Sequence, residues 1–194
     1  MTRCGAVFLV MAGLFATPDV ARCQPASGSM RKEVIASGVL MAPVGAFHRA
    51  LPTIGGGGGF HALFARRARP VAFGVDGQLL FYSPPDHQDE MILTAHGVVR
   101  VRRPLDRRRP FVEAIGGIKG FSAEGSSRVG TYSYGAGAGI QFPVGRSKIA
   151  GPGEREVYEI GVRYLRGGGA HLDAQHIASS THTITVHVGW GLEF

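Results

Sequence analysis

The last twelve residues of the chain alternate between apolar and polar or small side chains, and this pattern constrains the fold more than any other feature. One face of the segment 183–194 is wholly apolar and carries Ile184, Val186, Val188, Trp190, Leu192 and Phe194. The other face carries Thr, His, Gly and Glu residues. Because successive side chains of a β-strand point to opposite faces, this segment predicts a strand with one apolar side.

Similar alternation recurs along the rest of the chain, interrupted by clusters of Gly, Pro, Ser and Asp. The clearer segments are 71–82, 89–101, 130–142 and 157–165, and the weaker ones are 33–42, 57–65 and 111–121. With the last segment they number eight, an even number, as a closed up-and-down barrel with both termini on one side requires. The sequence therefore predicts an all-β fold, an eight-stranded antiparallel up-and-down barrel.

Two of these segments and one glycine run are harder to interpret. The faces of the strands near 33–42 and 111–121 are left unassigned, and in 111–121 a β-bulge is one explanation of the poor alternation. The run Gly55–Gly59 is interpreted as a flexible loop that leads into the second strand. It has no following Lys-Ser/Thr pair, which argues against a phosphate-binding loop.

The polar face distinguishes a membrane barrel from a soluble, lipocalin-like barrel with an apolar interior. This face consists mostly of Gly, Ser and Thr with isolated charges, whereas a solvated surface would carry many Lys and Glu residues. Small residues in a narrow lumen leave room for a few buried charges to pair, so the pattern favours a transmembrane barrel. The charges predicted to form an ion-pair network in the lumen are Asp76, Arg100, Glu113, Lys119, Glu159, Arg163 and Glu193. A narrow polar conduit is the alternative role for them.

Aromatic residues on the apolar faces gather near the two predicted ends of the barrel, as the two interfaces of a bilayer select. One girdle contains Phe81, Tyr132, Tyr134 and Tyr164, and the other contains Phe64, Phe73, Phe142, Tyr158, Trp190 and Phe194.

The N-terminus predicts export. Arg3 precedes an apolar run over residues 6–16, which is too short to cross a bilayer as a helix, and Ala21 and Cys23 are small residues at a cleavage site. We therefore expect a signal peptide at 1–23, a short periplasmic segment at 24–32 and the barrel at 33–194. Arg22 before Cys23 argues against a lipoprotein. The mature chain then has no cysteine, and 19 basic against 13 acidic residues give it a formal net charge of +6.

These features resemble the small eight-stranded outer-membrane β-barrels, the class of the OmpA transmembrane domain and the OmpX-like proteins. The resemblance rests on the signal peptide, the alternating last strand and its terminal Phe194, and it covers residues 33–194. It implies a location in the bacterial outer membrane and contact with outer-membrane lipids. A last strand that ends in an aromatic residue also implies recognition by the barrel-insertion machinery. One departure is the stretch 143–154, which is long for a periplasmic turn.

With both termini in the periplasm, 13 of the 19 basic residues of the mature chain lie at the periplasmic end. The sequence places the following eight in a periplasmic basic girdle: Arg66, Arg67, Arg69, Arg102, Arg103, Arg107, Arg108 and Arg109. Two readings stay open, attraction to anionic lipid headgroups and solvated turns in which Arg serves solubility. Nucleic-acid binding fits the charge but not the compartment.

No motif identifies a ligand, and the sequence indicates no metal site and no cofactor. The candidate catalytic residues are Ser180 and His182, with Asp173 as an orienting carboxylate, because a hydroxyl and an imidazole two residues apart share one strand face. The sequence favours a non-enzymatic barrel with a structural or loop-mediated binding role in the envelope. A lipid A deacylase-like enzyme and a narrow transporter of small or apolar solutes are the alternatives.

Overall fold

The computed structural model describes residues 30–66, 69–83, 90–103, 107–123, 129–146, 154–171 and 177–194. The predicted signal peptide at 1–23 and residues 24–29 of the predicted periplasmic segment lie outside the described residues. The barrel strands are β1 (Met30–Val44), β2 (Gly55–Arg66), β3 (Val71–Tyr82), β4 (Glu90–Arg102), β5 (Arg109–Ala123), β6 (Val129–Arg146), β7 (Arg155–Gly167) and β10 (Thr181–Glu193). A short helix, α2 (Ala46–Ala50), and two strands of two residues, β8 (Ala170–His171) and β9 (Ile177–Ala178), complete the elements.

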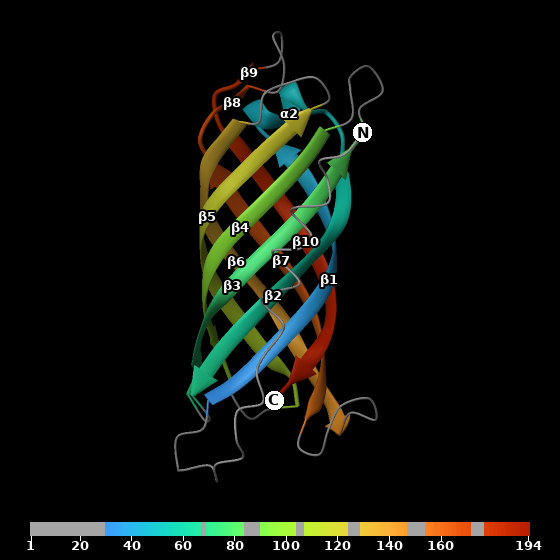
Figure 1. Cartoon of the computed structure of the whole chain (residues 1–194), viewed down its shortest axis with the longest axis vertical. Helices are drawn as coiled ribbons and strands as arrows, with labels where there is room; N and C mark the ends of the chain where they lie inside the picture. The colour runs from blue at the N-terminus through green and yellow to red at the C-terminus, as the bar shows by residue number, and fades with distance from the viewer. Residues whose placement is uncertain are drawn as a thin grey trace, which may run out of the picture.

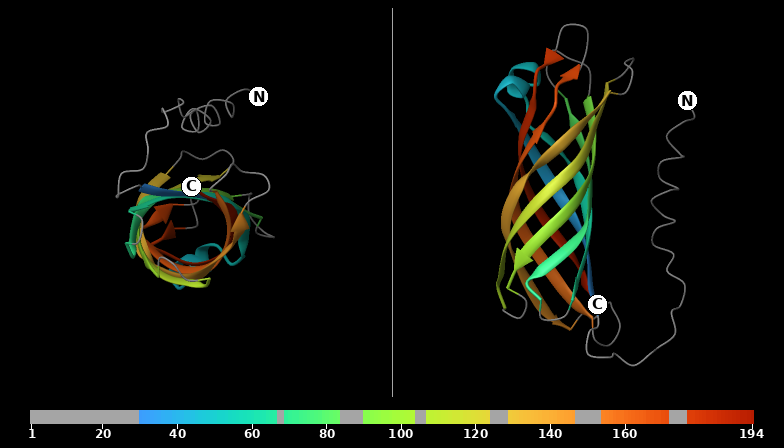
Figure 2. Two further views of the ribbon diagram at one scale, coloured as in Figure 1. Left: turned by 90° about the horizontal axis from the view of Figure 1, so that it is seen from below. Right: turned by 90° about the vertical axis from the view of Figure 1, so that its left-hand side faces the viewer.

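The eight long strands form one closed antiparallel barrel in the order β1-β10-β7-β6-β5-β4-β3-β2 (Figure 1). Seen along its axis the barrel is a complete ring (Figure 2, left), closed by β1 and β10, which pair from Glu33 with Glu193 to Val44 with His182. The predicted eight-stranded up-and-down barrel is therefore confirmed. We call the end where β1 begins and β10 ends the terminal end, and the opposite end, which carries α2, the α2 end. No helix in the part of the chain that the structure describes is long and apolar enough to span a membrane.

Alternation of burial runs through the strands, as the alternation of the sequence predicts. In β4 every even-numbered residue from Glu90 to Arg102 is buried, and the odd-numbered residues between them are exposed or half-buried. The segment 111–121, whose faces the sequence leaves open, also alternates without a bulge: Phe111, Ile115 and the charged residues of the same parity all point inwards. An apolar side chain thus shares the lumen with charges.

The glycine run is part of a strand, which corrects its interpretation as a loop: β2 begins at Gly55 and pairs with both β1 and β3. Its glycines are required by close approach of neighbouring groups. A Cβ atom on Gly55 would collide with the Tyr82 ring, and one on Gly57 would collide with the carbonyl oxygen of Leu79. Gly55 therefore leaves space inside the barrel for the Tyr82 ring, and Gly57 allows close approach to the backbone of β3.

The predicted turn that begins at Pro143 is shorter than expected, because β6 continues to Arg146. A register shift between Val144 and Arg146 marks the end of its pairing with β7, and Gly145 between them has a positive φ of 34°. Residues 147–153 lie outside the described residues.

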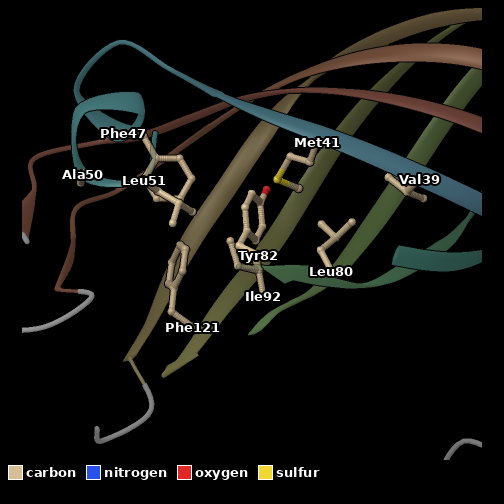
Figure 3. Close-up of a cluster of buried hydrophobic side chains, with 9 residues drawn as sticks. All are labelled: Val39, Met41, Phe47, Ala50, Leu51, Leu80, Tyr82, Ile92 and Phe121. Carbon is tan, nitrogen blue, oxygen red and sulfur yellow. The ribbon is translucent and has the colours of Figure 1, made fainter. Parts of the chain in front are cut away.

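An apolar plug fills the lumen at the α2 end (Figure 3). Gly45, with φ 61° and ψ −131°, adopts a backbone conformation that a side chain disfavours, and from it the chain turns into α2. Phe47 and Leu51 then pack against side chains from the strand ends, and the Phe47 and Phe121 rings meet edge to face with centroids 5.9 Å apart. The plug consists of Val39, Met41, Phe47, Ala50, Leu51, Leu80, Tyr82, Ile92 and Phe121.

Candidate functional site

The outside of the barrel is apolar from one strand end to the other. The outward-facing residues between the strand ends are aliphatic, aromatic, alanine or glycine, and many large ones are strongly exposed, such as Val188 at 59% and Ile118 at 65%. Polar outward residues lie only near the ends, for example Lys32, Arg66 and Arg166. Such a surface suits a hydrocarbon solvent and not water.

All ten aromatic residues of the two predicted girdles point outwards, and nine of them are exposed while Phe142 is half-buried. The structure places one set towards the α2 end and the other towards the terminal end, where Phe64 and Phe73 pair directly and Phe142 pairs with Tyr158.

The centre of the lumen is organised around Arg100 of β4, whose side chain is wholly buried. Its Nε and Nη2 atoms donate to Glu113 Oε2 at 3.0 and 2.8 Å, and its Nη1 atom donates to Glu159 Oε2 at 2.5 Å. The guanidinium also lies over the Phe111 ring, 3.8 Å from its centroid. One arginine thus joins carboxylates from β5 and β7, and an aromatic face covers it.

A second arginine extends these contacts towards β3. Arg163 of β7 donates from Nε to Glu113 Oε1 at 2.6 Å and from Nη1 to Asp76 Oδ2 at 2.8 Å. The other oxygen of Asp76 accepts from Gln78 Nε2 at 3.1 Å and lies 3.6 Å from His96 Nδ1. Both carboxylate oxygens of Asp76 and both of Glu113 thus accept from donors in the lumen, which offsets part of the cost of burying the charges.

Towards the terminal end the contacts continue through Gln141 of β6. Its Nε2 atom donates to Glu159 Oε2 at 2.8 Å and to Glu33 Oε2 at 3.3 Å. Arg102 Nη1 donates to the same Glu33 oxygen at 2.5 Å and to Gln141 Oε1 at 2.8 Å. These bonds connect the centre of the lumen to β1 at its beginning.

Glu193 near the C-terminus ends this series. It accepts from Arg109 Nη1 at 2.5 Å and from Arg31 Nη2. Arg109 and Arg102 are 1% and 4% exposed, which corrects their placement in the periplasmic girdle. Both have the parity of the lumen, and the strands extend far enough at this end to carry them inside.

We call this connected set the lumen column. It pairs five carboxylates, Glu33, Asp76, Glu113, Glu159 and Glu193, with five arginines, Arg31, Arg100, Arg102, Arg109 and Arg163. His61 and His187 contact Glu159 at 3.7 and 3.0 Å. Six of the seven charges predicted for the lumen belong to the column. Sequence reasoning missed Glu33 and the histidines, although their lumen parity was the signal that could have found them.

Lys119, the seventh predicted charge, lies apart from the column. It is wholly buried, and its Nζ atom contacts Thr183 Oγ1 at 3.4 Å and the Phe47 ring at 5.9 Å. It forms no ion pair with any residue that the structure describes. Thr181, Thr183 and Thr185, which follow one another on the inner face of β10, are also wholly buried.

The candidate catalytic residues are only partly brought together. His182 faces outwards at the α2 end, where its Nδ1 atom is hydrogen-bonded to the Tyr164 hydroxyl and the two rings lie 5.8 Å apart. Ser180 precedes β10 and is half-buried. Asp173 lies outside the described residues. The His182 ring therefore contacts a tyrosine.

The remaining arginines of the predicted girdle lie at the terminal end. Arg66, Arg69, Arg103, Arg107 and Arg108 are exposed there, and Arg67 lies outside the described residues. Over the part of the chain that the structure describes, no three His, Cys, Asp or Glu side chains are grouped to hold a metal ion.

The sequence matches no protein-family model and no curated protein. Among solved structures, Neisserial surface protein A matches with a TM-score of 0.54 and 12% identity, over 87% of this chain and 98% of its own. OprG from Pseudomonas aeruginosa (TM-score 0.47, 8% identity) and Ail from Yersinia pestis (0.45, 14%) also cover 87% of this chain, and 97% and 100% of theirs.

The likeness to Neisserial surface protein A shows the fold, and it confirms the predicted resemblance to the small eight-stranded outer-membrane barrels. An apolar exterior on such a barrel, with its charges inside, is the surface of a membrane-spanning protein. Fold and exterior together place the protein in the bacterial outer membrane.

Proposed function

We propose that this protein is a non-enzymatic outer-membrane barrel with a structural or loop-mediated binding role in the cell envelope. The observation that carries the proposal is the filled lumen. Charged side chains of the lumen column occupy its centre and terminal end, and the apolar plug occupies the α2 end. Packing of this kind inside an eight-stranded barrel argues against a path for a solute between the described residues.

The exterior supports the same role. The apolar wall meets only lipid, so contacts with soluble partners fall to the two ends of the barrel. We place the terminal end in the periplasm and the α2 end, with the segments that connect its strands, at the cell surface. Export through the signal peptide and insertion through the last strand belong to this proposal.

The orientation is tested with peptide tags on intact cells. A tag within 124–128, between β5 and β6 at the α2 end, should react with antibody added outside. A matched tag within 104–106, between β4 and β5 at the terminal end, should react only after the cells are opened. The reverse result would overturn the orientation.

The absence of transport and catalysis is tested separately. The purified barrel in a planar bilayer should give no conductance steps, while a porin in the same bilayer gives them as a positive control. Lipids from cells with and without the protein should show the same lipid A acyl pattern. Reproducible conductance would favour the transporter, and an acyl chain lost only when Ser180 and His182 are intact would favour the enzyme.

A further inference from the structure

A groove on the outside of the barrel lies at the terminal end, where β2 turns into β3. It has a volume of about 410 Å³, and its lining includes Met30, Phe64, Arg66, Arg69, Val71 and Phe73. The described lining thus combines an apolar floor with two arginines, and none of its described residues is a carboxylate. We call it the β2–β3 groove.

The floor of the groove belongs to the lipid-facing wall. Phe64 and Phe73 pair directly across β2 and β3, and they are 40% and 59% exposed. Met30, which pairs with Arg66, is also 59% exposed. These side chains lie in the apolar exterior described above, so the groove opens towards hydrocarbon.

The rim of the groove is cationic. Arg66 follows Phe64 by two residues on the same outward face, which puts their Cα atoms roughly 7 Å apart along the strand. The backbone N–H of Arg69 donates to the carbonyl oxygen of Arg66 at 3.0 Å, which keeps the two arginines on one turn. Both are exposed, and neither forms an ion pair with any described residue.

We propose that the β2–β3 groove binds one anionic phospholipid of the periplasmic leaflet. Arg66 and Arg69 hold the headgroup phosphate, for which guanidinium groups are suited, and an acyl chain lies on Phe64 and Phe73. A phospholipid has a charged headgroup, then glycerol, then acyl chains. The groove has the matching order, from the two arginines to the Phe64 and Phe73 rings. The inference rests on the proposed placement of the terminal end in the periplasm.

The test measures lipid retention by native mass spectrometry of the delipidated full-length barrel in detergent, titrated with phosphatidylglycerol. The double variant Arg66→Gln/Arg69→Gln should weaken binding at least tenfold. Arg107→Gln/Arg108→Gln is the matched control, because it removes two exposed arginines from the same end outside the groove, and it should stay within twofold of the unmodified protein. Phe64→Ala/Phe73→Ala should also weaken binding.

Four results would overturn the proposal. Equal losses from both arginine pairs would indicate a diffuse charged rim, and no loss from Arg66→Gln/Arg69→Gln would remove the site. Equal affinity for zwitterionic phosphatidylcholine, or full competition by glycerol phosphate, would mean that the anionic lipid is not what is recognised. The assay in detergent reads the groove alone, so it can fail while the conductance and lipid tests of the proposed function succeed.

Discussion

Arg100 on β4 donates to Glu159 on β7 across the lumen, with Nη1 2.5 Å from Oε2, although the two strands are not neighbours in the barrel. Both side chains are almost wholly buried. A contact of this kind ties opposite walls together, and removing either partner leaves the buried charge of the other with fewer groups to stabilise it.

Replacing Glu159 by Ala should therefore lower the free energy of unfolding by about 3–5 kcal/mol, because Arg100 loses a carboxylate in a buried site. Urea titration of the barrel in lipid vesicles measures the change. The double variant Glu159→Ala/Arg100→Met should lose less than the two single variants together. Additive losses would show that the pair is not coupled.

Gly55→Ala should destabilise the apolar plug by about 1–3 kcal/mol, because the added methyl group collides with the Tyr82 ring. Gly38→Ala is the control, since a Cβ atom there meets no atom within 4 Å. Tyr82→Leu should restore most of the loss in the Gly55→Ala background. A neutral Gly55→Ala variant would contradict the close packing at this end.

Lys119→Met should raise the free energy of unfolding by about 1–3 kcal/mol, because it replaces a buried cation that has no carboxylate partner among the described residues by an apolar side chain of similar length. The same substitution at exposed Lys32 should change it by less than about 0.5 kcal/mol. Thermal unfolding in detergent compares the two, and a destabilised Lys119→Met variant would indicate that the ammonium group has a stabilising partner.

Val188→Arg should cost roughly 2–4 kcal/mol, since the residue is exposed on the lipid side near the middle of β10. Val188→Leu should cost little. Vesicle-based unfolding is again the measurement, and the penalty should shrink for an arginine placed near a strand end. A cost that does not depend on depth would argue against a bilayer around the barrel.

The mature protein should begin near Gln24 and fractionate with outer membranes. Mass spectrometry of the intact membrane-bound chain measures this directly. A chain that keeps Met1 or Cys4 would contradict the predicted signal peptide.

The strands and their faces were largely predictable from the sequence, because lipid outside and a filled lumen inside impose opposite chemistry on alternate residues. The inward face of β5 could not be predicted, because Phe111 packs on the Arg100 guanidinium and so brings an aromatic ring to the charged side. The helix α2 could not be predicted either, since five residues are too few to show a helical repeat of apolar residues. Its position depends on the apolar plug, to which β3, β4 and β5, three strands that are distant from it in sequence, contribute side chains.

Errors in the predicted site arose where strands end. Arg102 and Arg109 lie at the ends of the predicted turn between two strands. Nothing in the local sequence distinguishes an arginine in a turn from one whose side chain points into the lumen. Their carboxylate partners, Glu33 and Glu193, lie 69 and 84 residues away along the chain. Only the closed barrel brings these groups together.

The lumen column also bears on the order in which the barrel assembles. Glu33 lies on β1 and Glu193 on β10, the strands that close the ring, and each has an arginine partner on a distant strand, Arg102 of β4 and Arg109 of β5. An open sheet would hold these charges apart, each in need of water. Their pairing becomes available only when the two edges meet, so closure and the completion of the interior happen in one step. Partly closed intermediates gain little stability, and folding should be cooperative, with edge-to-edge joining as its slow event.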